Sequence, residues 1–225
     1  MTKIVISLTR TSIILSLFLT CPFSTAGAET FNGKWEQGAR FGPSFLTQDL
    51  ADQTVGYLGP MVNYNISYGL SDQILVGLNL EWEKHQVKDR SSGFYFGDES
   101  TLSIMPTIEY HVIGASIQQQ LINYSPYILG GIGVNINSFT ESDNLNTSCA
   151  PITCKISPKN TLALKVGWGI DFFITSNLAL NGEMDLKLNS GIADISGSYL
   201  GYASTTSADN RVSVLSFLLG ARYFY

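Results

Sequence analysis

The 225-residue chain is poor in the residues that most often carry chemistry. It has three cysteines and two histidines, and charged residues make up 14 % of it. No stretch approaches the roughly 20 continuous apolar residues of a membrane-spanning helix, so we expect no helical anchor. Lysine and arginine together number 13 against 18 acidic residues, and no basic stripe is present. This charge pattern argues against nucleic acid as a partner.

The first residues have the features of an export signal. Basic residues precede a short apolar run, Ile13–Leu19, and the small-x-small triplet Ala26-Gly27-Ala28 follows it. This order is typical of a secretory signal peptide, and the apolar run is too short to span a membrane. We predict a signal peptide over residues 1–28, with cleavage between Ala28 and Glu29.

The mature chain is expected to form one domain, residues 29–225, because no Pro- or Ser-rich linker or compositional break divides it. Its two cysteines, Cys149 and Cys154, enclose a short loop, and export makes a disulfide between them plausible. A bond that closes so short a loop would tie the loop rather than hold the fold. A metal site is the alternative, but no histidine lies near the two cysteines in the sequence.

The carboxy-terminal segment alternates with a period of two residues. Alternation with an unbroken apolar row and an aromatic end is typical of a strand in an outer-membrane barrel, where one face meets lipid. We expect this strand to be recognised by the outer-membrane assembly machinery. The apolar row consists of Leu215, Phe217, Leu219, Ala221, Tyr223 and Tyr225.

The same alternation recurs along the whole mature chain. It marks eight segments, each long enough for a tilted membrane strand of about 9–11 residues. An even number is the rule for single-chain bacterial barrels. We therefore predict an all-β fold, an eight-stranded antiparallel transmembrane up-and-down β-barrel. The segments are residues 34–46, 55–68, 74–85, 101–111, 127–139, 161–173, 178–189 and 214–225.

The connections between these segments alternate in length. Residues 69–72 and 175–177 form tight turns, whereas 89–98, 140–160 and 190–210 form long polar loops. Short periplasmic turns and long outer loops are the usual asymmetry, which predicts a bacterial outer-membrane location with both termini in the periplasm. The long connection Ile113 to Asn123 departs from this pattern. A soluble sandwich or lipocalin-like barrel would also alternate, but the signal peptide, the even count and the aromatic end favour the membrane barrel.

Three stretches carry a resemblance to a known superfamily: Tyr68–Gln73, Ser125–Gly133 and Gly220–Tyr225. Together they resemble the eight-stranded outer-membrane barrels that include the OmpA transmembrane domain, OmpX, OmpW and the opacity-type surface proteins. The usual ending in this superfamily is a terminal Phe, whereas here Phe224 is penultimate. The resemblance extends over the mature chain, but its motifs are architectural. It implies the fold and permits several roles, a narrow OmpW-like channel for small solutes or cations among them.

The rows opposite the apolar ones would face the lumen. Eight strands leave an interior that side chains can fill, and opposite charges buried there must pair. We interpret these residues as a polar plug. The alternative is a narrow passage opened by breaking ion pairs, which would favour cations because carboxylates outnumber bases. The lumenal network predicted from the sequence consists of Lys34, Glu36, Arg40, Glu81, Glu83, Glu109, Lys165, Asp171, Glu183, Asp185, Lys187 and Arg222.

The sequence gives little support for catalysis. The two histidines, His85 and His111, are expected near opposite ends of the barrel, and a lipid-modifying site of His85 with Ser91 or Ser92 lacks any family motif. We expect no enzymatic activity, no cofactor and no metal.

The outer loops are the remaining candidate. Ser91–Phe96 and Ile195–Tyr202 combine aromatics with Ser and Gly, a mix suited to partner contacts. We expect a structural or surface-interaction role, adhesion-like or antigen-like. The expected partners are outer-membrane lipid, lipopolysaccharide and a host or cell-surface ligand.

Overall fold

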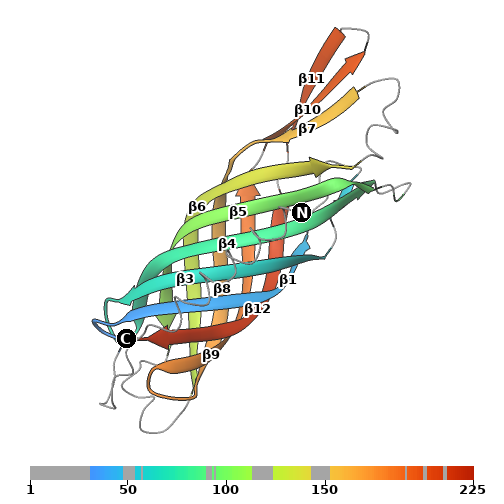
Figure 1. The fold of residues 1–225 in the computed structure, drawn as a ribbon. Coiled ribbons are helices and arrows are strands. Elements are labelled where there is room, and N and C mark those ends of the chain that lie inside the picture. Colours follow the sequence, from blue (N-terminus) through green and yellow to red (C-terminus); the bar gives the residue numbers. More distant parts are fainter. Residues whose placement is uncertain are drawn as a thin grey trace, which may run out of the picture.

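The computed structural model describes residues 31–47, 54–56, 58–89, 93, 95–112, 124–142, 153–190, 192–199, 202–209 and 212–225, and every regular element among them is a β-strand (Figure 1). Each barrel strand pairs in antiparallel fashion with the barrel strand that follows it in the chain, and the last pairs with the first, which closes the barrel. Closure gives the backbone N–H and C=O groups of every barrel strand hydrogen-bond partners on both sides, as the interior of a membrane requires. The predicted eight-stranded barrel is confirmed. Its strands are β1 (Trp35–Leu46), β3 (Gly59–Gly69), β4 (Ile74–Asp89), β5 (Tyr95–His111), β6 (Tyr124–Glu141), β8 (Thr161–Phe173), β9 (Leu178–Ser190) and β12 (Val212–Phe224).

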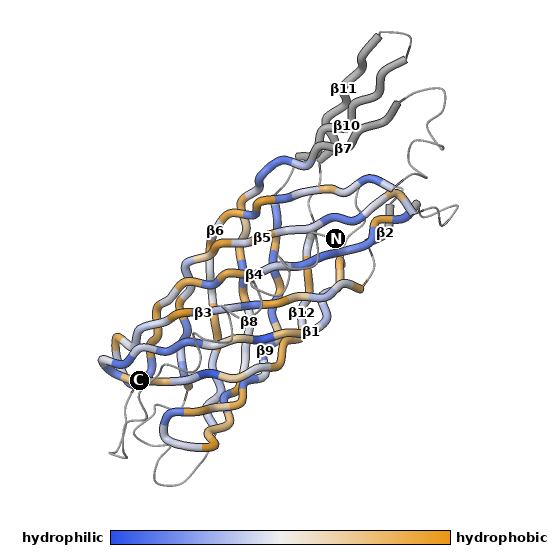
Figure 2. Tube along the Cα trace, in the orientation of Figure 1, coloured by the Kyte–Doolittle hydropathy of each residue, from blue (hydrophilic) through white to orange (hydrophobic). Residues whose placement is uncertain are grey.

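The alternation of side chains follows the predicted faces. On β3, Asn63 and Asn65 are buried in the barrel, while Val62 and Ile66 are exposed on its outside. Successive side chains of a strand point to opposite faces of the sheet, so a barrel built from such strands is polar inside and apolar outside. Figure 2 shows the resulting alternation of hydrophilic and hydrophobic residues along the barrel strands.

The ladder between β1 and β12 has one irregular place. Phe41 pairs with Leu219 and Ser44 with Ser216 in the same register, but the two residues between them on β1 make no ladder pair with β12. Proline has no N–H to donate to a ladder, and Pro43 lies in this gap. The neighbouring Gly42 approaches β12 so closely that a Cβ there would lie 1.8 Å from the carbonyl oxygen of Phe217. Only glycine fits this position without moving the strand.

An apolar cluster fills the barrel end near the short turns. It consists of the buried residues Phe31, Leu75, Ala179 and Phe224, with Phe173 packed against them. The ring of Phe31 stacks on that of Phe224 at a centroid distance of 5.3 Å. The residues just before β1 hold Phe31 in place, since its carbonyl accepts a hydrogen bond from the backbone N–H of residue 34 at 3.0 Å. This end of the barrel therefore has an aromatic floor, which the sequence pattern did not predict.

The opposite end carries additional strands. The short strand β2 (Thr54–Gly56) pairs with the end of β4. Strands β7 (Thr153–Pro158), β10 (Ile192–Tyr199) and β11 (Tyr202–Asp209) form a separate antiparallel sheet, which Figure 1 shows beyond the end of the barrel. The long polar loops predicted over 140–160 and 190–210 thus contain paired strands, which the sequence analysis did not predict. A sheet that does not face lipid needs no apolar row, so its polar sequence concealed its backbone pairing.

Several predicted features lie outside the described residues: the signal peptide with its cleavage site at Ala28 and Glu29, the connection 113–123, Ser91 and Ser92, and Cys149. Cys154 lies on β7, opposite Gly197 of β10. The Cys149–Cys154 disulfide stays a prediction. Within the described part of the chain, no helix is long and apolar enough to cross a membrane.

The lumenal charge network as candidate functional site

The inward rows of the strands fill the barrel with charged side chains. Lys34 precedes β1 and is half-buried. All other members of the predicted network are buried. They come from six strands: Glu36 and Arg40 on β1, Glu81 and Glu83 on β4, Glu109 on β5, Lys165 and Asp171 on β8, Glu183, Asp185 and Lys187 on β9, and Arg222 on β12.

Arg222 organises the half of the lumen nearer the aromatic floor. Its Nε donates to Glu36 at 2.9 Å, its Nη1 to Asp171 at 3.1 Å and its Nη2 to Glu109 at 2.7 Å. The guanidinium group also lies over the Tyr127 ring, 5.3 Å from its centroid. The planar fork of arginine suits such multiple carboxylate contacts. One cation thus joins carboxylates from three other strands.

Lys165 and Lys187 organise the other half. The Nζ of Lys165 donates to Glu81 and, at 3.0 Å, to Glu183, and lies 3.1 Å from Asp185. The Nζ of Lys187 lies 2.8 Å from Glu83 and 3.5 Å from Glu81. Glu81 therefore bridges the two lysines, and the cluster connects β4 with β8 and β9 across the lumen.

Arg40 links the two halves. Its Nη1 lies 3.4 Å from Glu183, and its Nη2 lies 4.0 Å from Glu109. Since Glu109 also binds Arg222 and Glu183 also binds Lys165, the ion pairs form one continuous network along the lumen. Buried charges need such pairing, because an unpaired one costs several kcal/mol.

Neutral side chains complete the network, and the sequence-based set omitted them. The Tyr127 hydroxyl donates to Glu183 at 2.8 Å and accepts from the Asn181 amide at 2.9 Å. The amide of Asn63 donates to Glu81, and that of Asn65 to Glu36. All four lie in the inward rows, so strand parity was the signal that could have found them.

The two histidines lie at opposite ends of the barrel. The ring of His111 lies by the aromatic floor, with Nδ1 2.9 Å from the Ser125 hydroxyl. His85 pairs in register with Glu99 on β5, the strand that ends at His111. The 12 residue steps from Glu99 to His111 span about 40 Å at the rise of an extended strand. The histidines cannot act on one substrate.

His85 lies by Ser44 rather than in a recognisable catalytic arrangement. Its Nε2 is 3.2 Å from the Ser44 hydroxyl and 3.5 Å from Glu83. In a serine triad the serine and the acid meet different ring nitrogens of the histidine. These two contacts share one nitrogen. Among the described residues, no cluster of three or more His, Cys, Asp or Glu side chains could hold a metal ion.

The ends of β4 and β5 that lie farther from the short turns extend past the lipid-facing apolar row. Trp82 and Leu102 face each other at its edge, and polar residues follow on both strands. Here the Lys84 ammonium lies 2.6 Å from Asp98 and holds the pKa of that carboxyl below its usual range. Burial, together with the nearby Glu83 carboxylate, raises the pKa of Glu99 to about 7.

Comparisons with known proteins agree on the fold. No family model and no curated protein sequence matches the chain. Solved structures do match. OprG of Pseudomonas aeruginosa is 17 % identical, with 89 % of this chain and 99 % of OprG covered at a TM-score of 0.61.

AlkL in lipid bilayers is 17 % identical, and the match covers 92 % of this chain and 96 % of AlkL at a TM-score of 0.55. A third match is the attachment invasion locus protein Ail of Yersinia pestis, in complex with the heparin analogue sucrose octasulfate. Ail is 15 % identical, and the match covers 86 % of this chain and 99 % of Ail at a TM-score of 0.50. At these identities the likeness concerns the fold.

Proposed function

Because the chain has the fold of the eight-stranded outer-membrane β-barrels, we propose that it is a plugged surface barrel, a rigid membrane scaffold that presents an external β-sheet to a partner. The single observation that carries this proposal is the filled lumen. Arg40, Lys165, Lys187 and Arg222 are all buried and bound to carboxylates from facing strands. Moving an ion through the barrel would require several of these pairs to break, each at a cost of several kcal/mol.

The extra sheet supports the second half of the proposal. Strands β7, β10 and β11 project beyond the barrel end that carries the long connections, and rigid scaffolds usually place binding on such segments. The barrel is oriented with the end that carries the long connections outside the cell, so that the sheet lies outside and both termini lie in the periplasm. The partner is a host or cell-surface ligand or lipopolysaccharide, and β12 meets the assembly machinery. Ail, a fold neighbour, is an attachment protein whose structure contains a heparin analogue.

The proposal includes no catalytic role. The narrow cation channel is the competing function, and the same closed network opposes it. A conducting form would have to separate Glu81 from Lys165 and Glu183 from Arg40 without unfolding the barrel.

The surface role can be tested by removing the sheet. Bacteria that display the full protein are compared with bacteria that display a variant in which residues 192–209 are replaced by a tight turn. Binding to cultured epithelial cells and to immobilised lipopolysaccharide is measured, and a heat-modifiable gel shift checks that both barrels fold. We expect at least a tenfold loss of binding with folding intact. Equal binding of the two strains would overturn the surface role.

A further inference from the structure

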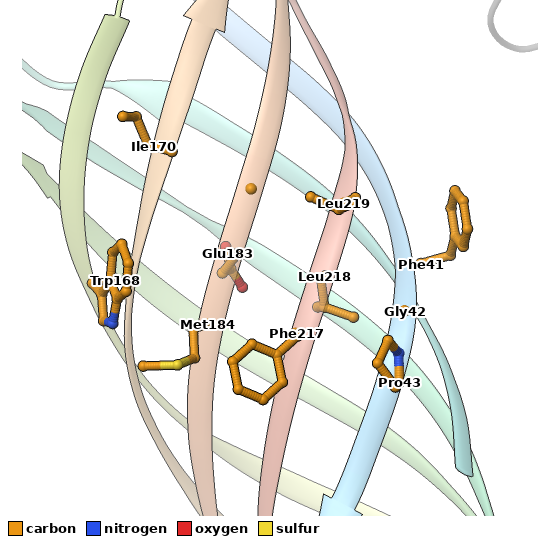
Figure 3. A pocket seen from close by; sticks show the side chains of 11 residues that line it. Phe41, Gly42, Pro43, Trp168, Ile170, Glu183, Met184, Phe217, Leu218 and Leu219 are labelled. Carbon is orange, nitrogen blue, oxygen red and sulfur yellow. The ribbon is translucent and has the colours of Figure 1, made fainter. Parts of the chain in front are cut away.

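The outer wall of the barrel carries a groove of about 480 Å³, which crosses strands β8, β9, β12 and β1. Figure 3 shows Trp168, Met184, Phe217 and Phe41 around it. Its volume lies within the about 300–1,000 Å³ of small-molecule sites. The lumenal ion pairs lie on the other side of this wall, and of their residues only Glu183 also lines the groove.

The strand register explains why a groove forms here. Across the wall, Ile170 on β8 pairs with Gly182 on β9, and Gly182 pairs with Leu219 on β12. Strands are about 4.8 Å apart, so the missing side chain leaves a gap about 10 Å wide between the Ile170 and Leu219 backbones. In the next row Met184 and Phe217 occupy the corresponding positions and form one edge of the gap.

Gly182 is not required by the backbone. A Cβ at this position would make only ordinary contacts, 3.6 Å from Leu219 and 3.9 Å from Ile170. The absence of a side chain therefore shapes the surface rather than permitting a tight approach of strands. The two most exposed of the large apolar side chains described, Phe41 at 69 % and Leu219 at 67 %, lie in the same row.

We propose that this groove binds one acyl chain of a membrane phospholipid. The groove is continuous with the lipid-facing surface, so hydrocarbon is the medium that must fill it. Gly182 lies four residues from the start of β9 and eight from its end, hence nearer the short turns. In the orientation proposed above, on which this step rests, that half meets the inner leaflet, whose lipids reach the groove with their acyl chains.

Trp168 supplies a direct probe, since it lines the groove and faces lipid. The experiment uses the refolded barrel with Trp35→Phe and Trp82→Phe, in vesicles of phosphatidylcholine brominated near the middle of its acyl chains. Bromine quenches tryptophan fluorescence at short range. A matching protein that keeps only Trp82, which lies on β4 away from the groove, serves as the lipid-exposed reference.

Filling the groove should then separate the two probes. We expect Gly182→Leu to reduce the quenching of Trp168 at least twofold and to leave Trp82 unchanged, with Gly182→Ala intermediate and safe for folding. Gly130→Leu is the matched control, because Gly130 lies on β6 beyond the groove and a Cβ there would meet only a carbonyl at 4.0 Å. It should leave both probes unchanged.

Three results would overturn the proposal: equal quenching of Trp168 with and without the leucine, an equal loss in Gly130→Leu, or quenching of Trp168 that rises on dilution of the protein. The last would mean that a second copy of the chain covers the groove. Symmetric vesicles expose both leaflets to the same lipid, so a wrong orientation of the barrel would not change the outcome. Proteolysis of residues 192–209 from outside intact cells tests orientation separately.

Discussion

Replacing Arg222 with methionine should destabilise the barrel strongly. Methionine keeps much of the side-chain volume but removes three charge-assisted hydrogen bonds, of 2.7 to 3.1 Å, to Glu36, Asp171 and Glu109. Each such bond contributes about 1.5–3 kcal/mol, and breaking a buried ion pair by removing one partner costs about 3–5 kcal/mol. Because three carboxylates lose their cation together, we expect the free energy of unfolding to fall by about 4 kcal/mol or more.

The assay is urea unfolding of the refolded barrel in lipid vesicles, followed by the gel shift that separates folded from unfolded barrel. Lys84→Met is the matched control. Lys84 also binds a carboxylate, Asp98 at 2.6 Å, but its side chain is 42 % exposed, and exposed pairs contribute about 0–1 kcal/mol. Equal, small losses in both variants would refute the conclusion that the lumenal ion pairs are buried and mutually dependent.

Three further variants test other parts of the structure. The pKa of Glu99 is raised from 4.5 to about 7, so its charged form opposes folding: stability should fall as pH rises from 4.5 through 7, and Glu99→Gln should remove that fall in urea midpoints. The pKa of Asp98 is lowered, so its charged form stabilises the fold. Asp98→Asn should therefore lower the urea midpoint at neutral pH, and this difference should disappear as pH falls through and below 3.8. Phe31→Ala should cost about 3–5 kcal/mol by emptying the aromatic floor, measured by the same unfolding assay, whereas an unchanged midpoint would show that the floor is dispensable.

The sequence predicted the barrel because a lipid-facing strand must alternate. An apolar row such as Leu215, Phe217 and Leu219 must face lipid, and the alternating row then gives the charged residues that face the lumen. The individual partners could not be predicted. The alternation places Arg222 on the inward face but does not give the stagger between distant strands. That stagger brings Arg222 to Glu109 on β5, which lies 113 residues away in the chain.

Other features left no periodic signal. Phe31 belongs to no strand, so its place in the aromatic floor depends on a turn before β1. The sheet of β7, β10 and β11 does not face lipid and needs no apolar row. The groove depends on Gly182, one of 21 glycines, and only the register between β8, β9 and β12 distinguishes it from the others.

The plugged lumen is tested most directly by the single-channel conductance of the refolded barrel, residues 29–225, in a planar bilayer, with insertion shown by the gel shift. A silent bilayer at neutral pH is expected, because Arg40, Lys165, Lys187 and Arg222 all remain paired. Reproducible cation-selective steps from the folded protein would contradict the plug and establish the narrow channel in its place.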